Sequence, residues 1–198
     1  MKLYGAPESI SLATHIALVE SGMPYEFELV DIRNHTYLDG RSYLQENPKR
    51  YVPFMVLDDG TMLTESIATL LYVSDHELNR NLTRGDDRYR VIEWLTFVAT
   101  EIHQRLMRTG MPGLSEEMKN ATMVQIRERF GDAAARLADR NVLVGDFVTV
   151  ADILLYNACR WLHYIDIDIG QWPRLAEFYN RMTHRPAVRK ALAEEGIQ

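Results

Sequence analysis

The sequence contains a single cysteine, Cys159, among its 198 residues. One cysteine cannot form an internal disulfide, and without a C-x-x-C pair a metal site of the cysteine type is excluded. No apolar run approaches the ~20 residues of a membrane-spanning helix, and no apolar segment follows Lys2 as a signal peptide requires. A net charge of −6 argues against nucleic acid and anionic membranes as partners. We therefore expect a soluble cytoplasmic protein that holds no metal.

The most informative stretch runs from residue 50 to residue 76. Residues 54–57 form an apolar run of strand length, and Asp59-Gly60 is a hairpin signal because glycine tolerates the positive φ of tight turns. Residues 62–63 continue into a second strand. Apolar and small residues then recur between 67 and 74 at the three- and four-residue spacing of a helix face. This pattern predicts a β-hairpin followed directly by a helix.

The start of that helix is a candidate binding site. Glu65 and Ser66 lie where free backbone N–H groups and a partial positive charge favour a bound carboxylate. Ser66 can add a hydroxyl donor, and Glu65 can accept from an ammonium group. Val52-Pro53 precedes the strand at the same edge, so the site is suited to a small zwitterion beside an extended backbone. The alternative is that Thr64 or Ser66 only caps the helix and Glu65 only stabilises its dipole.

The residues before this stretch predict the remainder of a first domain. Residues 2–5 form a short strand, residues 12–19 carry a helical pattern that ends at Gly22, and residues 25–32 form another strand. The span 33–51 is expected to be a loop with one helical turn. The order β-α-β followed by a β-hairpin and a helix is typical of a thioredoxin-like α/β domain, which we expect to cover residues 1–78.

The rest of the chain predicts an all-helical bundle at 86–198 after a polar linker at 79–85. Thr149-Val150-Ala151-Asp152 has the pattern of a capping box and begins a largely apolar, buried helix. Asp152 is therefore expected to be a structural cap and not a catalytic acid. The other expected helix starts are Asp86, Ser115, Pro173 and Pro186.

Several motifs, in order, resemble one known family. They are M-K-L-Y at the start, H-I-A-L-V-E-S-G at 15–22, N-P-K at 47–49, Y-V-P, D-D-G, L-T-E-S-x-A-x-x-x-Y and T-V-A-D at 149–152. Together they resemble the cytosolic glutathione S-transferases, most closely the bacterial beta class, over nearly the whole chain. The resemblance implies that bound glutathione, as thiolate, attacks a small hydrophobic electrophile.

Such an enzyme needs only a hydrogen-bond donor that stabilises the thiolate. Ile10 stands where the beta class has a cysteine, and isoleucine can neither donate a proton nor form a mixed disulfide. The expected donor is Ser11 and then Ser9, with Tyr4 close by. The alternative is that one of the two serines is merely a helix cap.

The resemblance also implies the other site residues. Val52, beside Pro53, pairs with the cysteinyl backbone of glutathione, and Glu65 with Ser66 holds its γ-glutamyl end. His35 reaches the glycyl carboxylate or is an ordinary surface histidine. His103 donates near the sulfur or is structural. The remaining positions are Gln104, which replaces a lysine of the class, and Tyr156 and Trp161, which line the electrophile pocket or belong to the core.

The resemblance further implies a homodimer. Three alternatives to the transferase remain open at this point: a glutathione-dependent isomerase or dehalogenase, a glutathione-dependent reductase or peroxidase, and a non-enzymatic member of the fold that binds glutathione or a protein. Cys159 is expected to be a buried thiol, and His15 to be a hydrogen-bonded histidine inside the first helix.

Overall fold

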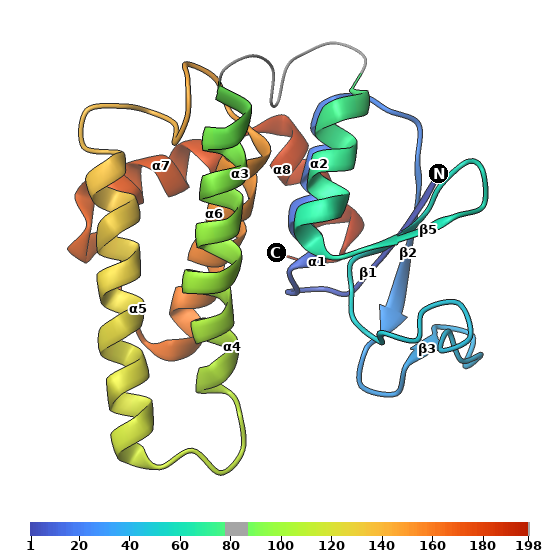
Figure 1. Cartoon of the computed structure of the whole chain (residues 1–198), viewed down its shortest axis with the longest axis horizontal. Coiled ribbons are helices and arrows are strands. Elements are labelled where there is room, and N and C mark those ends of the chain that lie inside the picture. The colour runs from blue at the N-terminus through green and yellow to red at the C-terminus, as the bar shows by residue number, and fades with distance from the viewer. Residues whose placement is uncertain (78–86, 198) are drawn as a thin grey trace. The chain divides into compact units, whose positions relative to one another are not determined.

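The computed structural model describes residues 1–77 and 87–197. They form two compact units (Figure 1). The first contains Met1–Thr83 together with His184–Gln198, and the second contains Arg84–Thr183. The predicted linker at 79–85, the expected end of the first domain at residue 78 and the expected cap Asp86 lie outside the described residues.

The first unit is built on a five-stranded mixed sheet with the strand order β3-β2-β1-β4-β5. The central strand β1 pairs parallel with β2 and antiparallel with β4, which pairs antiparallel with β5. This is the predicted thioredoxin-like arrangement. The bounds are Lys2–Gly5 for β1, Glu26–Asp31 for β2, Thr36–Tyr37 for β3, Phe54–Val56 for β4 and Met62–Thr64 for β5.

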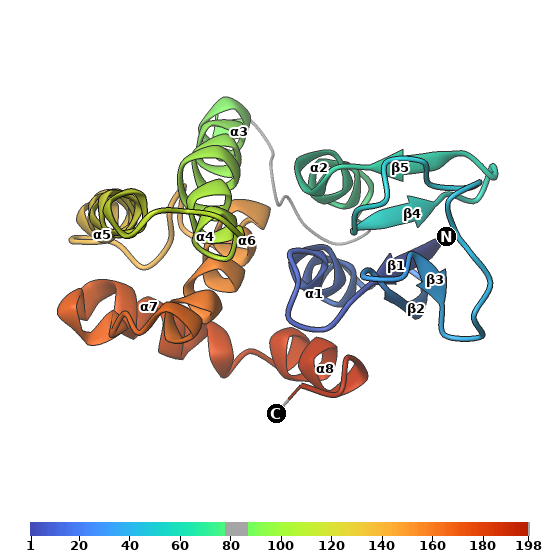
Figure 2. The ribbon, with the colours of Figure 1, turned by 90° about the horizontal axis from the view of Figure 1, so that it is seen from below.

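Two helices, α1 (Ser11–Ser21) and α2 (Ser66–His76), lie side by side against one face of this sheet (Figure 2). Alternation along β1 and β4 turns Leu3 and Met55 toward the helices, and both side chains are fully buried. Tyr4 and Phe54 point to the opposite face, where their rings stack at 4.5 Å within an aromatic cluster under the loop that follows β3.

The last helix, α8 (Pro186–Glu194), belongs to the first unit and packs against α1 (Figure 2). Its small apolar residues Ala187, Val188 and Ala191 are buried there. The second domain was predicted to span 86–198, whereas the second compact unit ends at residue 183. Residues 184–198 belong to the first unit because α8 buries its apolar face beside α1.

The second unit is helical, as predicted. One long helix consists of α3 (Arg88–Phe97), a π-helical segment (Val98–His103) and α4 (Gln104–Thr109). Every residue of α6 (Val150–Arg160) is buried, and α6 packs against α3, the π-helical segment and α7. The other elements are α5 (Glu116–Arg136), short 3₁₀ segments at Trp161–Ile165 and Ile169–Gln171, and α7 (Pro173–Thr183).

The predicted capping box at the start of α6 is present. The carboxylate of Asp152 accepts hydrogen bonds from the N–H and the hydroxyl of Thr149, both at 2.8 Å, and from the N–H of Leu143 at 2.8 Å. Asp152 is fully buried, and burial raises its pKa to about 6 although these bonds act to lower the pKa. Within the residues described, no helix is both long enough and apolar enough to cross a membrane.

Candidate functional site

Three segments of the first unit meet at one edge of the sheet. Tyr4, Phe54 and Thr64 are in register across β1, β4 and β5. Because β1 and β5 are each antiparallel to β4, they run in the same direction, and the helices that follow them begin at the same edge. Strand β4 starts at that edge, directly after the cis peptide bond between Val52 and Pro53. The edge therefore collects both helix starts and an extended backbone segment.

A hydroxyl pair joins the two helix starts. Thr14 is in the first turn of α1 and Thr69 is in the first turn of α2, and their Oγ1 atoms lie 2.8 Å apart in the interior. The N-termini of the two helices are thus neighbours and present their partial positive charges side by side, an arrangement suited to an anionic ligand.

The start of α2 places the predicted residues Glu65 and Ser66 at this edge. Glu65 precedes the helix with a left-handed φ of 76°, and its side chain is 69% exposed. Sequence reasoning missed the partner of this carboxylate. The ammonium of Lys49 lies 3.0 Å from Oε1 of Glu65 and 2.9 Å from Oγ1 of Thr64. The only sequence signal for Lys49 was its place in the N-P-K motif.

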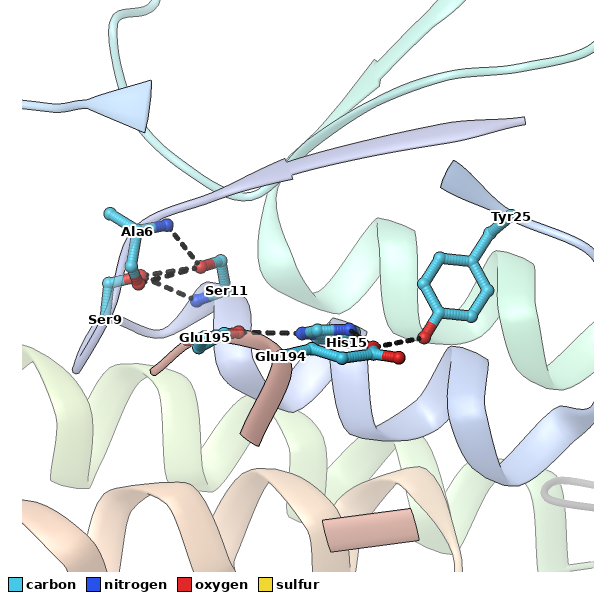
Figure 3. A network of polar contacts seen from close by, with 7 residues as sticks. All are labelled: Ala6, Ser9, Ser11, His15, Tyr25, Glu194 and Glu195. Atoms are coloured by element: carbon cyan, nitrogen blue, oxygen red, sulfur yellow. Dashed lines mark hydrogen bonds and ion pairs between the residues drawn. The ribbon is translucent and has the colours of Figure 1, made fainter. Parts of the chain in front are cut away.

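The start of α1 contains the two predicted thiolate donors (Figure 3). Oγ of Ser11 accepts from the N–H of Ala6 at 3.1 Å and lies 2.7 Å from Oγ of Ser9, which in turn accepts from the N–H of Ser11 at 3.2 Å. Ser11 is fully buried, whereas Ser9 is 9% exposed. The expectation that Ser11 is the foremost direct donor does not fit this burial, because its hydroxyl is turned inward onto Ala6 and Ser9.

Tyr4, the other nearby donor considered from the sequence, points away from this helix start. Its ring lies on the face of β1 that carries the aromatic cluster, while Gly5 beside it faces α1 closely enough that a Cβ there would approach Oγ of Ser11 to 2.7 Å. The alternation of side chains along β1 thus separates Tyr4 from Ser11.

Further along α1, His15 is hydrogen-bonded on both ring nitrogens, as Figure 3 shows. Nδ1 lies 2.9 Å from Glu195 and Nε2 lies 2.8 Å from Glu194, whose carboxylate also accepts from the hydroxyl of Tyr25 at 3.0 Å. His15 is fully buried, which confirms the expected hydrogen-bonded histidine. Burial acts to raise the pKa of Glu194, but the bonds from His15 and Tyr25 outweigh it and lower the pKa. This network ties α8 to α1.

His35 lies in the loop before β3 with a left-handed φ of 57°. Its ring meets Tyr43 edge-on, with the ring centroids 6.1 Å apart. Among the described residues, the buried Nδ1 of His35 has no hydrogen-bond partner. A ring nitrogen of this kind can serve an anionic group of a ligand, so the predicted role toward a glycyl carboxylate remains a prediction.

The other predicted site residues belong to the second unit. The rings of His103 and Trp161 lie 4.9 Å apart, and within the described part of the chain neither Nε2 of His103 nor Nε1 of Trp161 has a partner. Burial lowers the pKa of His103 to about 4, so the imidazole is neutral near pH 7. Gln104 is exposed at the next position. Tyr156 is fully buried and stacks on Tyr179, which agrees with the second of its two expected places, the core, and not with the electrophile pocket.

The single cysteine is not available for chemistry. Cys159 is 4% exposed on α6, and burial raises the pKa of its thiol. Among residues 1–77 and 87–197, no group of three or more His, Cys, Asp or Glu side chains is arranged to hold a metal ion. The helix starts at the sheet edge are therefore the best-defined site in the described structure.

Comparison with known proteins identifies the family. Residues 9–76 match the family described as "Glutathione S-transferase, N-terminal domain", and residues 67–186 match "Glutathione S-transferase, C-terminal domain". The chain belongs to the glutathione S-transferase family. This transferase is 35% identical over 201 residues to glutathione S-transferase GstA of Escherichia coli O157:H7, with all of both chains covered.

Solved structures agree over the full length of this transferase. The beta class glutathione S-transferase of Sphingomonas chungbukensis is 35% identical with a TM-score of 0.94, and all of each chain is covered. A sphingomonad glutathione S-transferase complexed with glutathione has the same identity, coverage and TM-score. The resemblance to bacterial beta class enzymes is thus confirmed, and full-length similarity to bacterial members makes the chain a glutathione transferase.

Proposed function

We propose that the sheet edge formed by Val52, Glu65 and the start of α1 binds glutathione and activates its thiol. The observation that carries this proposal is the meeting of two helix N-termini and one extended segment at that edge, joined by the hydroxyl pair of Thr14 and Thr69. In this proposal the carboxylate of the γ-glutamyl end lies at the start of α2 beside Ser66, and the ammonium of the same end contacts Glu65. The backbone of the cysteinyl residue lies along Val52.

In this proposal the thiol of glutathione lies at the start of α1. Ser9 is the direct donor, and Ser11 is a positioning residue that acts through it, since Ser11 is fully buried and lies 2.7 Å from the Ser9 hydroxyl. A donor and a helix N-terminus both favour the thiolate, which is the nucleophilic form. The thiolate then attacks a small hydrophobic electrophile and displaces a leaving group or opens a ring.

The sulfur chemistry depends on glutathione itself. Ile10 supplies no thiol at the start of α1, and the single cysteine, Cys159, is buried. A mixed disulfide between glutathione and the protein at this site is therefore not part of the proposal. His35 is proposed to serve the glycyl carboxylate, and His103, Gln104 and Trp161 to serve the sulfur and the electrophile.

Calorimetry tests the binding site. Ser66→Ala and Glu65→Ala each remove a charge-assisted hydrogen bond and should weaken the binding of glutathione by about 1.5–3 kcal/mol. Glu116→Ala is the matched control, because Glu116 is also an exposed glutamate at a helix start, and it should bind as the parent does. Parent-like affinity in both site variants would show that the site is misplaced.

The ultraviolet absorbance of bound thiolate, titrated with pH, tests the activation. A cysteine thiol has a pKa near ~8.5, and the bound thiol should titrate at lower pH in the parent. Ser9→Ala should return the pKa toward the free value, and Ser11→Ala should do so less, because Ser11 acts indirectly. A parent complex that titrates like free glutathione would contradict the proposed activation, and a lowered pKa untouched by either change would show that neither serine is the donor.

The homodimer implied by the resemblance is also proposed. Tyr51 is 81% exposed directly before Val52, and Leu38 is 71% exposed in the same unit, so apolar surface near the site is available to a second copy. Light scattering with size-exclusion chromatography should give twice the chain mass of 22.9 kDa. A monomeric mass at micromolar concentration would contradict it.

A further inference from the structure

Lys49 makes a contact at the sheet edge that the proposed binding of glutathione does not use. Its ammonium contacts Oε1 of Glu65 at 3.0 Å and the hydroxyl of Thr64 at 2.9 Å. The two charged residues are 16 positions apart in sequence, so this is not a pair within one helix. The contact instead joins the turn before β4 to the start of α2.

The turn that carries Lys49 is firmly anchored. Asn47 is fully buried, and its side-chain amide donates to the carbonyl of Tyr51 at 2.9 Å. Tyr43, also fully buried, donates its hydroxyl to the carbonyl of Arg50 at 3.0 Å. Before Lys49, the N–H of Asn47 donates to the carbonyl of Tyr43 at 2.8 Å. Because the backbone is thus hydrogen-bonded both before and after Lys49, the lysine projects from a fixed base.

Glu65, by contrast, has little to hold its side chain. It lies outside α2, its side chain is 69% exposed, and its long side chain loses rotamer freedom when it binds a ligand. Lys49 restrains one carboxylate oxygen and leaves the other for a ligand ammonium. Holding a binding group in place before the ligand arrives reduces the entropy lost on association.

We propose that Lys49 is a positioning residue that fixes the Glu65 carboxylate for the free amino group of the γ-glutamyl end of glutathione. This inference rests on the proposed function. Lys49 also balances the charge of Glu65, so that the site takes a zwitterionic amino acid end in preference to a simple cation.

The test compares two ligands by calorimetry on the full chain: glutathione, and glutaryl-cysteinyl-glycine, which differs only by the missing γ-glutamyl amine. Lys49→Met should weaken the affinity for glutathione 3- to 10-fold, where tenfold corresponds to about 1.4 kcal/mol. Its affinity for the analogue should stay within twofold of the parent's. Lys49→Arg keeps a cationic donor and should restore most of the affinity for glutathione.

Two controls make the test specific. Lys119→Met removes another exposed Lys–Glu pair, that of Lys119 with Glu116 at 2.8 Å, and should change neither affinity. In a Glu65→Ala background, Lys49→Met should have no further effect on glutathione, because its action passes through the missing carboxylate.

Several results would overturn the inference. An equal loss for both ligands in Lys49→Met would mean a general structural effect or direct contact with another group of the peptide. Tighter binding of glutathione would mean that Lys49 competes for Glu65, and unchanged binding would mean that it does not position Glu65.

The Glu65→Ala variant separates this inference from the proposed function. If Glu65→Ala weakens the binding of glutathione while Lys49→Met does not, only the proposed role of Lys49 is refuted. If Glu65→Ala binds as the parent does, or the parent fails to bind glutathione, the proposed site fails and the role of Lys49 fails with it.

Discussion

Replacing Asp152 by alanine would remove the acceptor of three buried hydrogen bonds at the start of α6. A buried donor left without a partner costs about 1–3 kcal/mol, so three such donors give a gross loss of several kcal/mol. Part of this loss is offset, because the buried carboxylate is itself unfavourable when ionised. Its pKa lies at about 6 and not at the ordinary 3.8, a gap that corresponds to roughly 3 kcal/mol at neutral pH.

The net expectation for Asp152→Ala is a loss of about 3 kcal/mol in the free energy of unfolding, near the upper end of ordinary substitutions. Urea unfolding followed by tryptophan fluorescence suits this measurement, because Trp94, Trp161 and Trp172 all belong to the second unit with α6. Asp146→Ala is the matched control, because Asp146 is exposed in the loop before α6. This change should alter the free energy of unfolding by no more than about 0.5 kcal/mol.

The pH dependence of Asp152 has a definite sign. Between pH ~4 and ~6 the folded chain keeps a proton on Asp152 that the unfolded chain has released. The parent should therefore gain stability relative to Asp152→Asn as the pH falls from 7 to 5. Urea midpoints that shift in parallel for both proteins would refute the raised pKa. An unchanged midpoint in Asp152→Ala, together with abolished turnover, would refute the structural role itself.

The remaining predictions concern α1 with its contacts to α8 and β1, and His103 of the second unit. His15→Ala removes the imidazole that contacts Glu194 and the fully buried side chain of Glu195. The change should lower the free energy of unfolding by about 3–5 kcal/mol and speed hydrogen exchange in α8. Unchanged exchange in α8 would contradict the network. Gly5→Ala places a Cβ 2.7 Å from the Ser11 hydroxyl, so it should lower the melting temperature and weaken the binding of glutathione; a parent-like variant would show that Ser11 can move aside. Because the pKa of His103 lies near 4, the dependence of turnover on pH should show no inflection from His103 between pH 6 and 8. An inflection in this range that disappears in His103→Asn would refute this prediction.

Local patterns were sufficient for most elements of the fold. The Asp59-Gly60 signal placed the hairpin, the period change after residue 63 placed the start of α2, and the capping box placed the start of α6, because each depends on residues only a few positions apart. Strand β3 was not predicted. It has two residues, which pair antiparallel with Val30 and Asp31 of β2, and the residues between the two strands, 32–35, include no glycine of the kind that marked the hairpin at Gly60.

The candidate site was predictable in outline and not in its contacts. Glu65 and Ser66 followed from the helix period. The ion pair of Glu65 with Lys49 depends on how the turn before β4 folds back. The inward orientation of Ser11 depends on Ala6 and on the close approach of β1, which is tertiary information. For the same reason the sequence left Tyr156 open between a pocket and the core, whereas the structure shows its side chain fully buried.

The return of α8 to the first unit has a consequence for the order in which the chain folds during synthesis. The first unit needs residues 184–198 beside residues 1–83, whereas the second unit is a continuous segment. A ribosome therefore delivers all of the second unit before the first can be completed, and the sheet that bears the binding edge waits for its final helix. Contacts this distant in sequence are slow to form, so we expect the unit that carries the proposed glutathione site to be the last part to mature, although its strands are translated before the second unit.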